Sequence, residues 1–311
     1  MNLNIEKIKG EIEKAITGKN EIVEKVLAAI LAEGHILLED MPGVGKTTLA
    51  LACSKCLDMD FKRVQFTPDV VPSDITGFTM YDKNSGEFKY QEGAVMSNFF
   101  LADEINRTSS KTQSALLEVM SEGKVTVDGV SHMVPQPFVV VATQNPLGTA
   151  GTQMLPEAQL DRFMIQLSMG YPTFEDQVEI LMRRDKLNPM DKVEKAVSKE
   201  ELSEMINEVK EIYVHRNIYV YITRLVEATR CNTYIKLGIS PRGALALASI
   251  SKSWAYIQGR DFVIPEDVDQ VFADVCRHRI ILQPKARIDE KNKDEVLNEI
   301  LESVVAPKKP Q

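Results

Sequence analysis

A short run of residues near the start of the chain has the composition of a phosphate-binding loop. The run reads Gly43-Val44-Gly45-Lys46-Thr47-Thr48. Its glycines let the backbone wrap around an anion and turn several N–H groups towards it. The Lys46 ammonium is placed to reach the β- and γ-phosphates of a nucleotide, and the Thr47 hydroxyl can bind Mg²⁺. The run therefore predicts a nucleoside triphosphate as the ligand.

The residues around this loop support the prediction, with one departure. An apolar stretch of strand length, residues 36–38, precedes the loop, and a helical pattern follows it. The positive end of that helix would then face the phosphates. The strict loop pattern has glycine where this chain has Asp40. Because the core from Gly43 to Thr47 is intact, we interpret the sequence as a variant loop; a chance glycine turn before a helix is the alternative.

Two neighbouring carboxylates follow a later apolar run, Phe99 to Ala102. Asp103 could hold the water shell of Mg²⁺, and Glu104 is placed to orient or deprotonate the water molecule that attacks the γ-phosphate. An isolated Asp-Glu pair is usually a solvated turn. Here the pair ends a predicted strand and follows the phosphate loop, so the two motifs together predict hydrolysis of the bound nucleotide.

A third polar group ends another apolar strand pattern, which begins at Val139. Strands of a parallel sheet deliver ligand-binding groups from their carboxyl ends. Asn145 could therefore hydrogen-bond the γ-phosphate or the attacking water molecule. Taken alone, its amide could equally shape the turn before Pro146.

The spacing of apolar residues predicts the elements that must hold these motifs. Helical patterns separate most of five apolar runs of strand length, which favours a parallel sheet with helices on its faces. These runs are residues 36–38, 64–66, 99–101, 138–141 and 163–167. Two hairpins interrupt the scheme, at 78–90 and at 124–134, and the second carries the strong turn signal Asp128-Gly129.

The second half of the chain has a different character. Ser198 and Glu201 form the pattern of a capping box, and Ser240-Pro241 has the pattern of a helix start. No strand pattern is as convincing here as in the first half. We therefore expect an α/β nucleotide-binding core over residues 1–172 and a smaller all-α domain over residues 173–311.

Composition restricts the class of protein. The 311 residues include 37 Lys and Arg against 45 Asp and Glu, a net charge of −8, which disfavours a general electrostatic attraction to nucleic acid. No apolar run is long enough to span a bilayer, and the first residues lack the apolar core of a signal peptide. Four cysteines are too few for a disulfide scaffold, so we expect a cytoplasmic protein. Cys53 and Cys56 form an isolated CxxC, which favours buried small side chains over a zinc site.

Taken together, these motifs resemble those of the AAA+ ATPases, and specifically the MoxR family, over nearly the whole chain. Asp40 in place of glycine is similar to this family too, so the departure becomes support. The runs that carry the resemblance are 38–47, 65–69, 72–77, 101–107, 142–146 and 155–163.

The resemblance implies an ATP-driven ring, usually a hexamer, with ATP and Mg²⁺ bound at subunit boundaries. Lys46 and Thr47 match the Walker A motif, Asp103 and Glu104 match Walker B, and Asn145 matches sensor 1. Residues 67–93 look like the helix-2 insert and 124–134 like the pre-sensor-1 hairpin, both facing a central pore. The second domain would be the helical lid.

The resemblance also assigns two arginines and a base site. Arg162 matches the arginine finger that neutralises the γ-phosphate on the neighbouring subunit, although it could instead pair with Asp161 or be a surface charge. Arg242 matches sensor 2 on the lid, and its alternative is a plain helix-start residue. Adenine would pack near the turn around Gly18 and Val23.

Three functional hypotheses follow from these residues. The leading one is a chaperone-like ATPase that remodels or activates a protein, and the family often works with von Willebrand factor A domain proteins. A DNA-translocating motor is the second, and the charge of −8 argues against it. The third is a nucleotide-sensing scaffold with negligible turnover, and the intact Asp103, Glu104 and Arg162 argue against that.

Overall fold

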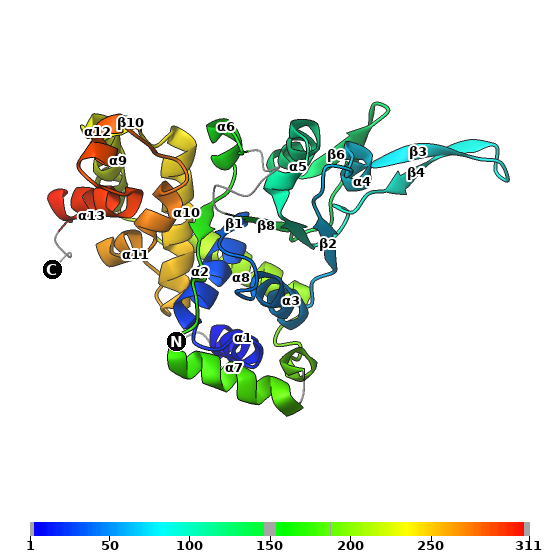
Figure 1. Cartoon of the computed structure of the whole chain (residues 1–311), viewed down its shortest axis with the longest axis horizontal. Coiled ribbons are helices and arrows are strands. Elements are labelled where there is room, and N and C mark those ends of the chain that lie inside the picture. The colour runs from blue at the N-terminus through cyan, green and yellow to red at the C-terminus, as the bar shows by residue number, and fades with distance from the viewer. Residues whose placement is uncertain (1–2, 146–153, 187, 308–311) are drawn as a thin grey trace.

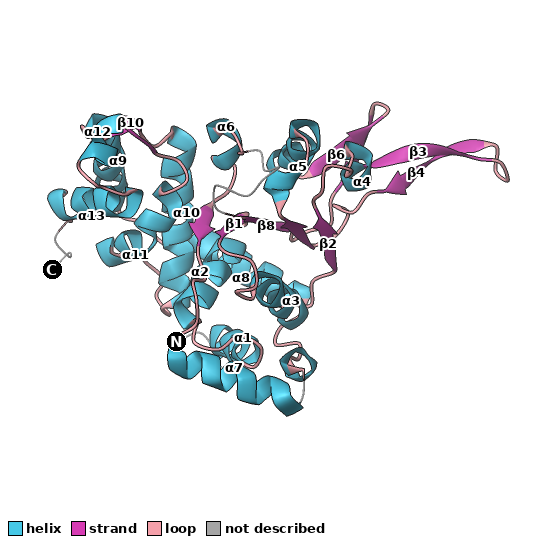
Figure 2. Ribbon diagram, viewed as in Figure 1, coloured by secondary structure: helices cyan, strands magenta, loops and turns pink. Residues whose placement is uncertain are grey.

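The chain folds into an α/β part and a mostly helical part, and Figures 1 and 2 show helices around a central set of strands. The computed structural model describes residues 3–145, 154–186 and 188–307. Its main helices are α1 (Leu3–Glu13), α2 (Asn20–Leu31), α3 (Lys46–Cys56), α4 (Pro72–Thr76), α5 (Ser110–Glu122), α6 (Glu157–Leu160), α7 (Phe174–Lys186), α8 (Lys199–Glu211), α9 (Arg216–Cys231), α10 (Pro241–Ile257), α11 (Pro265–Cys276), α12 (Pro284–Ile288) and α13 (Lys293–Ser303).

Five strands form one parallel sheet in the order β2-β5-β8-β1-β9. They are β1 (Ile36–Glu39), β2 (Phe61–Gln65), β5 (Phe99–Asp103), β8 (Val139–Gln144) and β9 (Ile165–Leu167). The predicted parallel sheet is therefore confirmed. Because parallel strands need crossovers, a helix or a longer excursion joins each strand to the next, and both faces of the sheet are covered.

Alternate side chains of each strand enter different cores. Leu37, Phe100 and Val140 lie in a cluster with Leu116 and Leu117 of α5. Their neighbours along the strands lie in a second cluster with side chains of α1, α2 and α3. This period of two is the packing that a strand buried on both faces requires, and it explains the nearly continuous apolar runs in the sequence.

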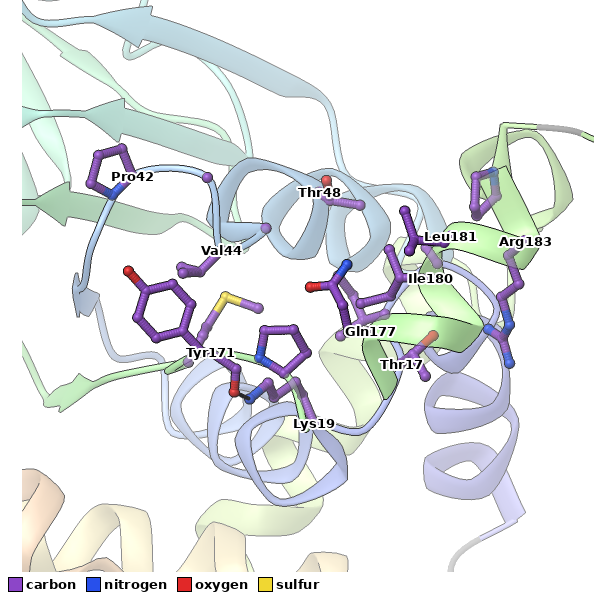
Figure 3. A pocket seen from close by; sticks show the side chains of 17 residues that line it. Thr17, Lys19, Pro42, Val44, Thr48, Tyr171, Gln177, Ile180, Leu181 and Arg183 are labelled. Atoms are coloured by element: carbon purple, nitrogen blue, oxygen red, sulfur yellow. Dashed lines mark hydrogen bonds between the residues drawn. The ribbon is translucent and has the colours of Figure 1, made fainter. Parts of the chain in front are cut away.

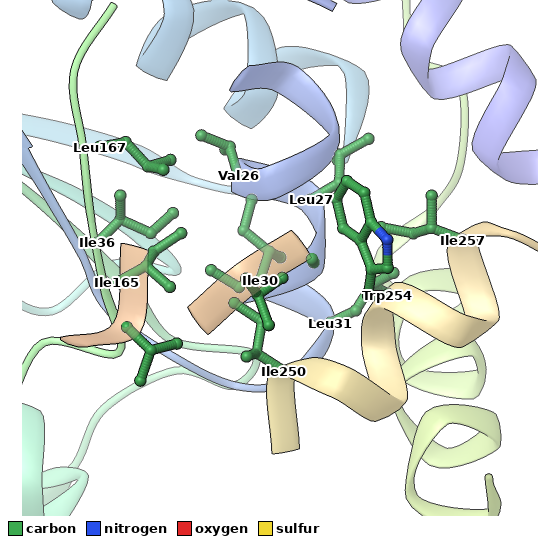
Figure 4. Packing of buried hydrophobic residues seen from close by; sticks show 14 of the residues in the cluster. Val26, Leu27, Ile30, Leu31, Ile36, Ile165, Leu167, Ile250, Trp254 and Ile257 are labelled. Atoms are coloured by element: carbon green, nitrogen blue, oxygen red, sulfur yellow. The ribbon is translucent and has the colours of Figure 1, made fainter. Parts of the chain in front are cut away.

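The second cluster continues without a break into the helices that follow residue 172. Trp254, the single tryptophan, is 6 % exposed on α10 and packs with α2 side chains such as Leu27 and Leu31 (Figure 4). Ile250 and Ile257 of the same helix join them. The apolar side of α10 therefore holds the lid helices against α2, on the face of the sheet that α2 covers.

The second half is predominantly helical, as predicted, with one addition. Strands β10 (Ile235–Leu237) and β11 (Ile281–Leu282) pair antiparallel across the lid helices. Runs of three and two residues are too short to show a strand period. Among the residues the structure describes, no helix combines the length and the apolar character needed to cross a membrane.

Both predicted hairpins are confirmed. Strands β3 (Gly77–Asp82) and β4 (Glu87–Glu92) form the longer one, which extends away from the body at the end opposite α13 (Figure 1). Strands β6 (Lys124–Val127) and β7 (Val130–Met133) form the other, with both turn residues, Asp128 and Gly129, at positive φ. The two hairpins touch where Tyr90 stacks on His132 at 3.9 Å between ring centroids.

A buried histidine joins the start of the sheet to α5. His35 donates from Nε2 to the carbonyl of Met120 at 2.9 Å, and its Nδ1 accepts the N–H of Val140 at 3.1 Å. This pair of bonds requires the neutral ring with its proton on Nε2. Burial lowers the pKa of His35 from 6.5 to about 4.

We expect the free energy of unfolding to fall as pH decreases from about 6.5 to about 4. The unfolded His35 takes a proton in this window while the folded one does not, so its contribution is complete above pH 6.5 and lost towards pH 4. The loss is about 3 kcal/mol. Urea unfolding at stepped pH measures it, and His35→Gln, which cannot titrate, should show a shallower slope. Equal slopes in the two proteins would contradict this assignment.

Candidate functional site

The loop between β1 and α3 has the backbone that an anion site requires. Gly43 and Gly45 adopt φ values of 87° and 99°, which side chains other than glycine rarely adopt. Gly45 is the N-cap of α3, so the first N–H groups of this helix point out of its open end. Thr47 and Thr48 lie in the first turn of α3. The predicted strand, loop and helix therefore occur in the order that binds phosphate.

Lys46 is buried beneath this loop. It is 7 % exposed, and its Nζ donates to the carbonyl of Asp40 at 2.7 Å. Burial lowers the pKa of Lys46, and the negative charges of Asp40, Asp103 and Glu104 oppose that lowering. The structure therefore brings the predicted lysine and the predicted carboxylates into one site.

Asp40, the departure from the strict loop pattern, has a structural task. One carboxylate oxygen accepts the N–H groups of Met169 and Gly170, the latter at 2.9 Å, and the Ser168 hydroxyl at 3.1 Å. The other oxygen accepts the N–H of Met41 at 3.1 Å. These bonds hold the segment that leaves β9 against the phosphate loop. Glycine at this position could not make them.

The Thr143 hydroxyl on β8 bonds to both residues of the Asp-Glu pair at the end of β5. It donates to Asp103 at 2.6 Å and accepts the N–H of Glu104 at 2.8 Å. The second oxygen of Asp103 accepts from Nη2 of Arg63 on β2 at 2.6 Å. Asp103 is therefore fixed from both sides.

Glu104 has an unusual backbone conformation, and each of its two carboxylate oxygens accepts a hydrogen bond. Its φ of 56° and ψ of 48° are left-handed, a conformation that non-glycine residues adopt mainly where surrounding contacts impose it. One carboxylate oxygen accepts from the Asn145 amide at 3.2 Å and the other from Arg107 at 2.8 Å. The predicted pair Glu104 and Asn145 is thus in direct contact, while Arg63 and Arg107 are site residues that the sequence did not reveal.

A cavity of about 400 Å³ opens beside the phosphate loop (Figure 3). Pro42, Gly43, Val44, Gly45 and Thr48 form one wall. The remaining walls come from the turn after α1, the segment after β9, and α7, and their residues include Ile16, Thr17, Met169, Tyr171, Gln177, Ile180 and Leu181. The volume and the mixture of apolar and polar side chains suit a nucleoside next to the phosphate site.

The two residues predicted for the base site do not line this cavity. Gly18 lines a neighbouring cavity and lies against the carboxylate of Asp176, so closely that a Cβ would come within 2.1 Å of it. Val23 is 1 % exposed and belongs to the apolar core. Thr17 and Lys19, the sequence neighbours of Gly18, do line the cavity, and Lys19 donates to the carbonyl of Tyr171 at 3.0 Å.

The two predicted arginines lie on different elements. Arg162 follows α6 and donates to the carbonyl of Leu117 on α5 at 2.7 Å and to the Ser121 hydroxyl. Arg242 is exposed at the first turn of α10. Cys53 and Cys56, the isolated pair, are both buried on α3, and burial raises the pKa of Cys53 to about 12.

We expect Asp40→Ala to lower the free energy of unfolding by about 1–3 kcal/mol, because the buried N–H of Met169 and the half-buried N–H of Gly170 would lose their acceptor. Urea unfolding without nucleotide measures the effect. Asp40→Asn keeps an oxygen acceptor and should cost less. A change of under about 0.5 kcal/mol in the alanine variant, as at an ordinary surface position, would show that these bonds do not hold the loop.

Each half of the chain matches the model of a known protein family. Residues 35–165 match the model described as the ATPase family associated with various cellular activities (AAA), and residues 227–300 match the AAA lid domain. These ranges contain the phosphate loop, the carboxylates and Arg162 on one side, and Arg242 on the other.

Individual proteins match over nearly the whole chain. The chain is 45 % identical to the protein YeaC of Bacillus subtilis, covering 95 % of this chain and 92 % of that one. It is 40 % identical to the chaperone MoxR1 of Mycobacterium tuberculosis, over 96 % and 81 % of the two chains. A crystal structure from Cytophaga hutchinsonii, of a protein assigned as an ATPase, superposes with a TM-score of 0.90 at 38 % identity, covering 98 % and 95 %. Both domains, the site motifs and these relatives agree, and the chain belongs to the MoxR family of AAA+ ATPases.

Proposed function

We propose that this protein hydrolyses ATP at the boundary between subunits and uses the cycle to remodel or activate a protein partner. The observation that carries the proposal is the contact between Glu104 and Asn145 beside Lys46. A carboxylate held by a sensor amide next to a phosphate-binding lysine is suited to activating water against a γ-phosphate. The similarity to the chaperone MoxR1 supports the protein-remodelling part.

The phosphate loop would hold the triphosphate. Its backbone N–H groups and the open end of α3 bind the anion, and Lys46 neutralises charge on the β- and γ-phosphates. Thr47 and Asp103 offer a hydroxyl and a carboxylate, which are the oxygen donors that Mg²⁺ prefers, so the residues present fit that ion. When bound, Mg²⁺ would supply charge that stabilises the transferring phosphoryl group.

Glu104 would act as the base for the attacking water. Its carboxylate accepts the water proton as the oxygen attacks phosphorus, and Asn145 orients Glu104 and the water. Arg107 holds the other carboxylate oxygen and restricts its rotation. Because Thr143 also fixes the Glu104 backbone, the base is positioned before the nucleotide arrives.

The nucleoside would occupy the cavity beside the loop. The apolar side chains of Ile16, Ile180 and Leu181 can cover the faces of an adenine ring, and Gln177 provides an amide for its edge. We therefore move the base site from Gly18 and Val23 to this set. Three of its members lie on α7, beyond residue 172, where we place the boundary between the nucleotide-binding core and the lid.

Assembly would complete the site. Arg162 follows α6 and bonds to α5 in its own chain, and as an arginine finger it would reach the γ-phosphate on a neighbouring subunit of a ring, most simply a hexamer. Arg242 would approach the nucleotide from the lid as sensor 2. The partner that best fits the family is a von Willebrand factor A domain protein, and we place both proteins in the cytoplasm.

Purified protein should hydrolyse ATP in the presence of Mg²⁺, and Glu104→Gln should reduce kcat by about 10²–10⁴ while ATP still binds. Arg162→Ala should reduce kcat by about 10³, and Arg224→Ala, which removes an exposed arginine of α9, should not. Mixing the Glu104→Gln and Arg162→Ala proteins tests action between subunits, since a boundary at which an Arg162→Ala subunit supplies Glu104 and its Glu104→Gln neighbour supplies Arg162 has both residues intact. If the mixture gains no activity over its components, Arg162 does not act on a neighbour; wild-type turnover no higher than that of Glu104→Gln would rule out hydrolysis.

We expect a purified von Willebrand factor A domain protein of the same organism to bind the ATP-bound Glu104→Gln protein more tightly than the nucleotide-free one. Trapping the ATP state should keep the partner-binding arrangement populated. Size-exclusion chromatography with light scattering gives ring size and complex together. Lys46→Ala, which should not hold ATP, is the control. Equal binding by the trap and by Lys46→Ala would contradict coupling of the partner to nucleotide.

A further inference from the structure

A single carboxylate lies between the Arg162 segment and the lid helix that carries Arg242. Asp161 directly precedes Arg162 in the chain. Its Oδ1 accepts from Nε of Arg279 at 2.7 Å, and its Oδ2 accepts from the Ser240 hydroxyl at 2.8 Å. Ser240 is the N-cap of α10, where Arg242 occupies the first turn. Asp161 therefore contacts both sides of the junction between core and lid.

Arg279 makes this junction rigid because its guanidinium is fully used. It is 5 % exposed and follows the end of α11. Nη2 donates to the carbonyl of Phe163 at 2.6 Å, and Nη1 donates to the carbonyl of Met164 at 3.0 Å and to that of Val275. Nη2 also donates to the carbonyl of Asp161 at 3.4 Å, so that, with the Asp161 carboxylate, five acceptors bind a planar fork whose geometry lysine could not reproduce.

The start of α10 is shaped to receive Arg279. A Cβ on Gly243 would lie 2.9 Å from Cδ of Arg279 and 2.6 Å from Ile239, so glycine is required for this approach. The N–H of Gly243 in turn donates to Ser240 at 3.1 Å. Burial lowers the pKa of Arg279, its bond to Asp161 opposes this, and the charge of Arg242 adds to the lowering, as expected for neighbouring guanidinium groups.

The neighbours of Arg279 strengthen the same junction. His278 bonds through Nε2 with the carbonyl of Phe163 at 3.0 Å, and Arg277 donates to the carbonyl of Gln166 at 3.0 Å. Three consecutive lid residues therefore hold the backbone from Asp161 to Gln166. A displacement of this lid segment would also displace the backbone next to Arg162.

We propose that Arg279 is a positioning residue that, through Asp161 and Ser240, holds Arg162 and Arg242 in a fixed relation to each other. The inference rests on the proposed function of those two arginines. It means that a lid movement caused by nucleotide at one boundary is transmitted through Asp161 to the arginine that serves the next boundary. Arg279 itself touches neither phosphate nor water.

A purely stabilising role is the competing explanation, and the lid contains a matched control for it. Arg260 forms a two-pronged pair with Asp267, which is 2 % exposed, within the lid helices and their loops. Removing the arginine of either pair leaves a carboxylate without its charged partner and destabilises the protein. Only removal of Arg279 should also change the positions of Arg162 and Arg242.

The test compares Arg279→Gln, Asp161→Asn and Arg260→Gln in two measurements on full-length protein. The first is hydrogen–deuterium exchange without nucleotide. Arg279→Gln should accelerate exchange both around residues 161–164 and at the start of α10, and Arg260→Gln should do so only around residues 260–267. The second is steady-state hydrolysis, in which Arg279→Gln should lower kcat by about 10- to 100-fold with KM for ATP within about twofold.

Asp161→Asn keeps the shape of the junction and should give the same pattern more weakly, so the test survives if Arg279→Gln does not fold. Faster exchange on one side only, or a kcat loss no larger than that of Arg260→Gln at equal folded fraction, would overturn the proposal. Absence of wild-type turnover would be a failure of the proposed function instead. In that case the exchange pattern alone decides whether Arg279 connects the two segments.

Discussion

The parallel register of β1, β5 and β8 is the constraint on which the site depends. Leu38 pairs with Thr143 and Ala102 with Ala142, so the three strands end at the same edge of the sheet. Asp40, Asp103 and Asn145 leave the strands at this edge. A shift of one residue would turn the alternating side chains to the other face, and both cores would lose their apolar groups together. The chemistry is therefore positioned by the same packing that stabilises the sheet.

The charges at this edge are matched before any ligand binds. Lys46 lies among Asp40, Asp103 and Glu104, while Arg63 and Arg107 pair with the two carboxylates of the β5 end. Isolated buried charges are costly, and each of these groups has a partner within hydrogen-bond distance or close by. In the proposed function, a triphosphate and Mg²⁺ would bring charges of both signs to this site, where the surrounding protein dipoles are already oriented.

The lid is joined to the core by two kinds of contact with different properties. The apolar contact between α10 and α2, centred on Trp254, is non-directional and tolerates small rotations. The polar junction at Asp161 is directional, because a guanidinium fork and a helix cap share one carboxylate. When the lid moves, the apolar side chains of α10 can shift against those of α2 without losing their packing. The hydrogen bonds of Asp161 to Ser240 and Arg279, in contrast, can be kept only if Asp161 moves with the lid. This difference is the basis of the proposed coupling between the lid and Arg162.

Much of the architecture follows from local patterns in the sequence. The phosphate loop, the hairpin turn at Asp128-Gly129 and the capping box at Ser198 depend on residues at most a few positions apart, so spacing reveals them. The strands were visible because burial on both faces produces continuous apolar runs. The short pair β10 and β11 was not visible, since two or three residues carry no period.

The contacts that complete the site depend on separations that no local pattern records. Arg63 is 40 residues from Asp103, and Arg279 is 118 residues from Asp161. The walls of the cavity beside the phosphate loop include α7 and the segment after β9. Because these elements are distant from the loop in the sequence, no local pattern indicated Tyr171 and Leu181, and the sequence pointed to Gly18 and Val23 instead. The sequence by itself determined the phosphate loop, the two carboxylates and the order of elements, because these follow from neighbouring residues and hydrophobic period. Only the tertiary structure decided which residues line the cavity beside the phosphate loop and which partner each charge has, because these arise where distant elements pack against one another.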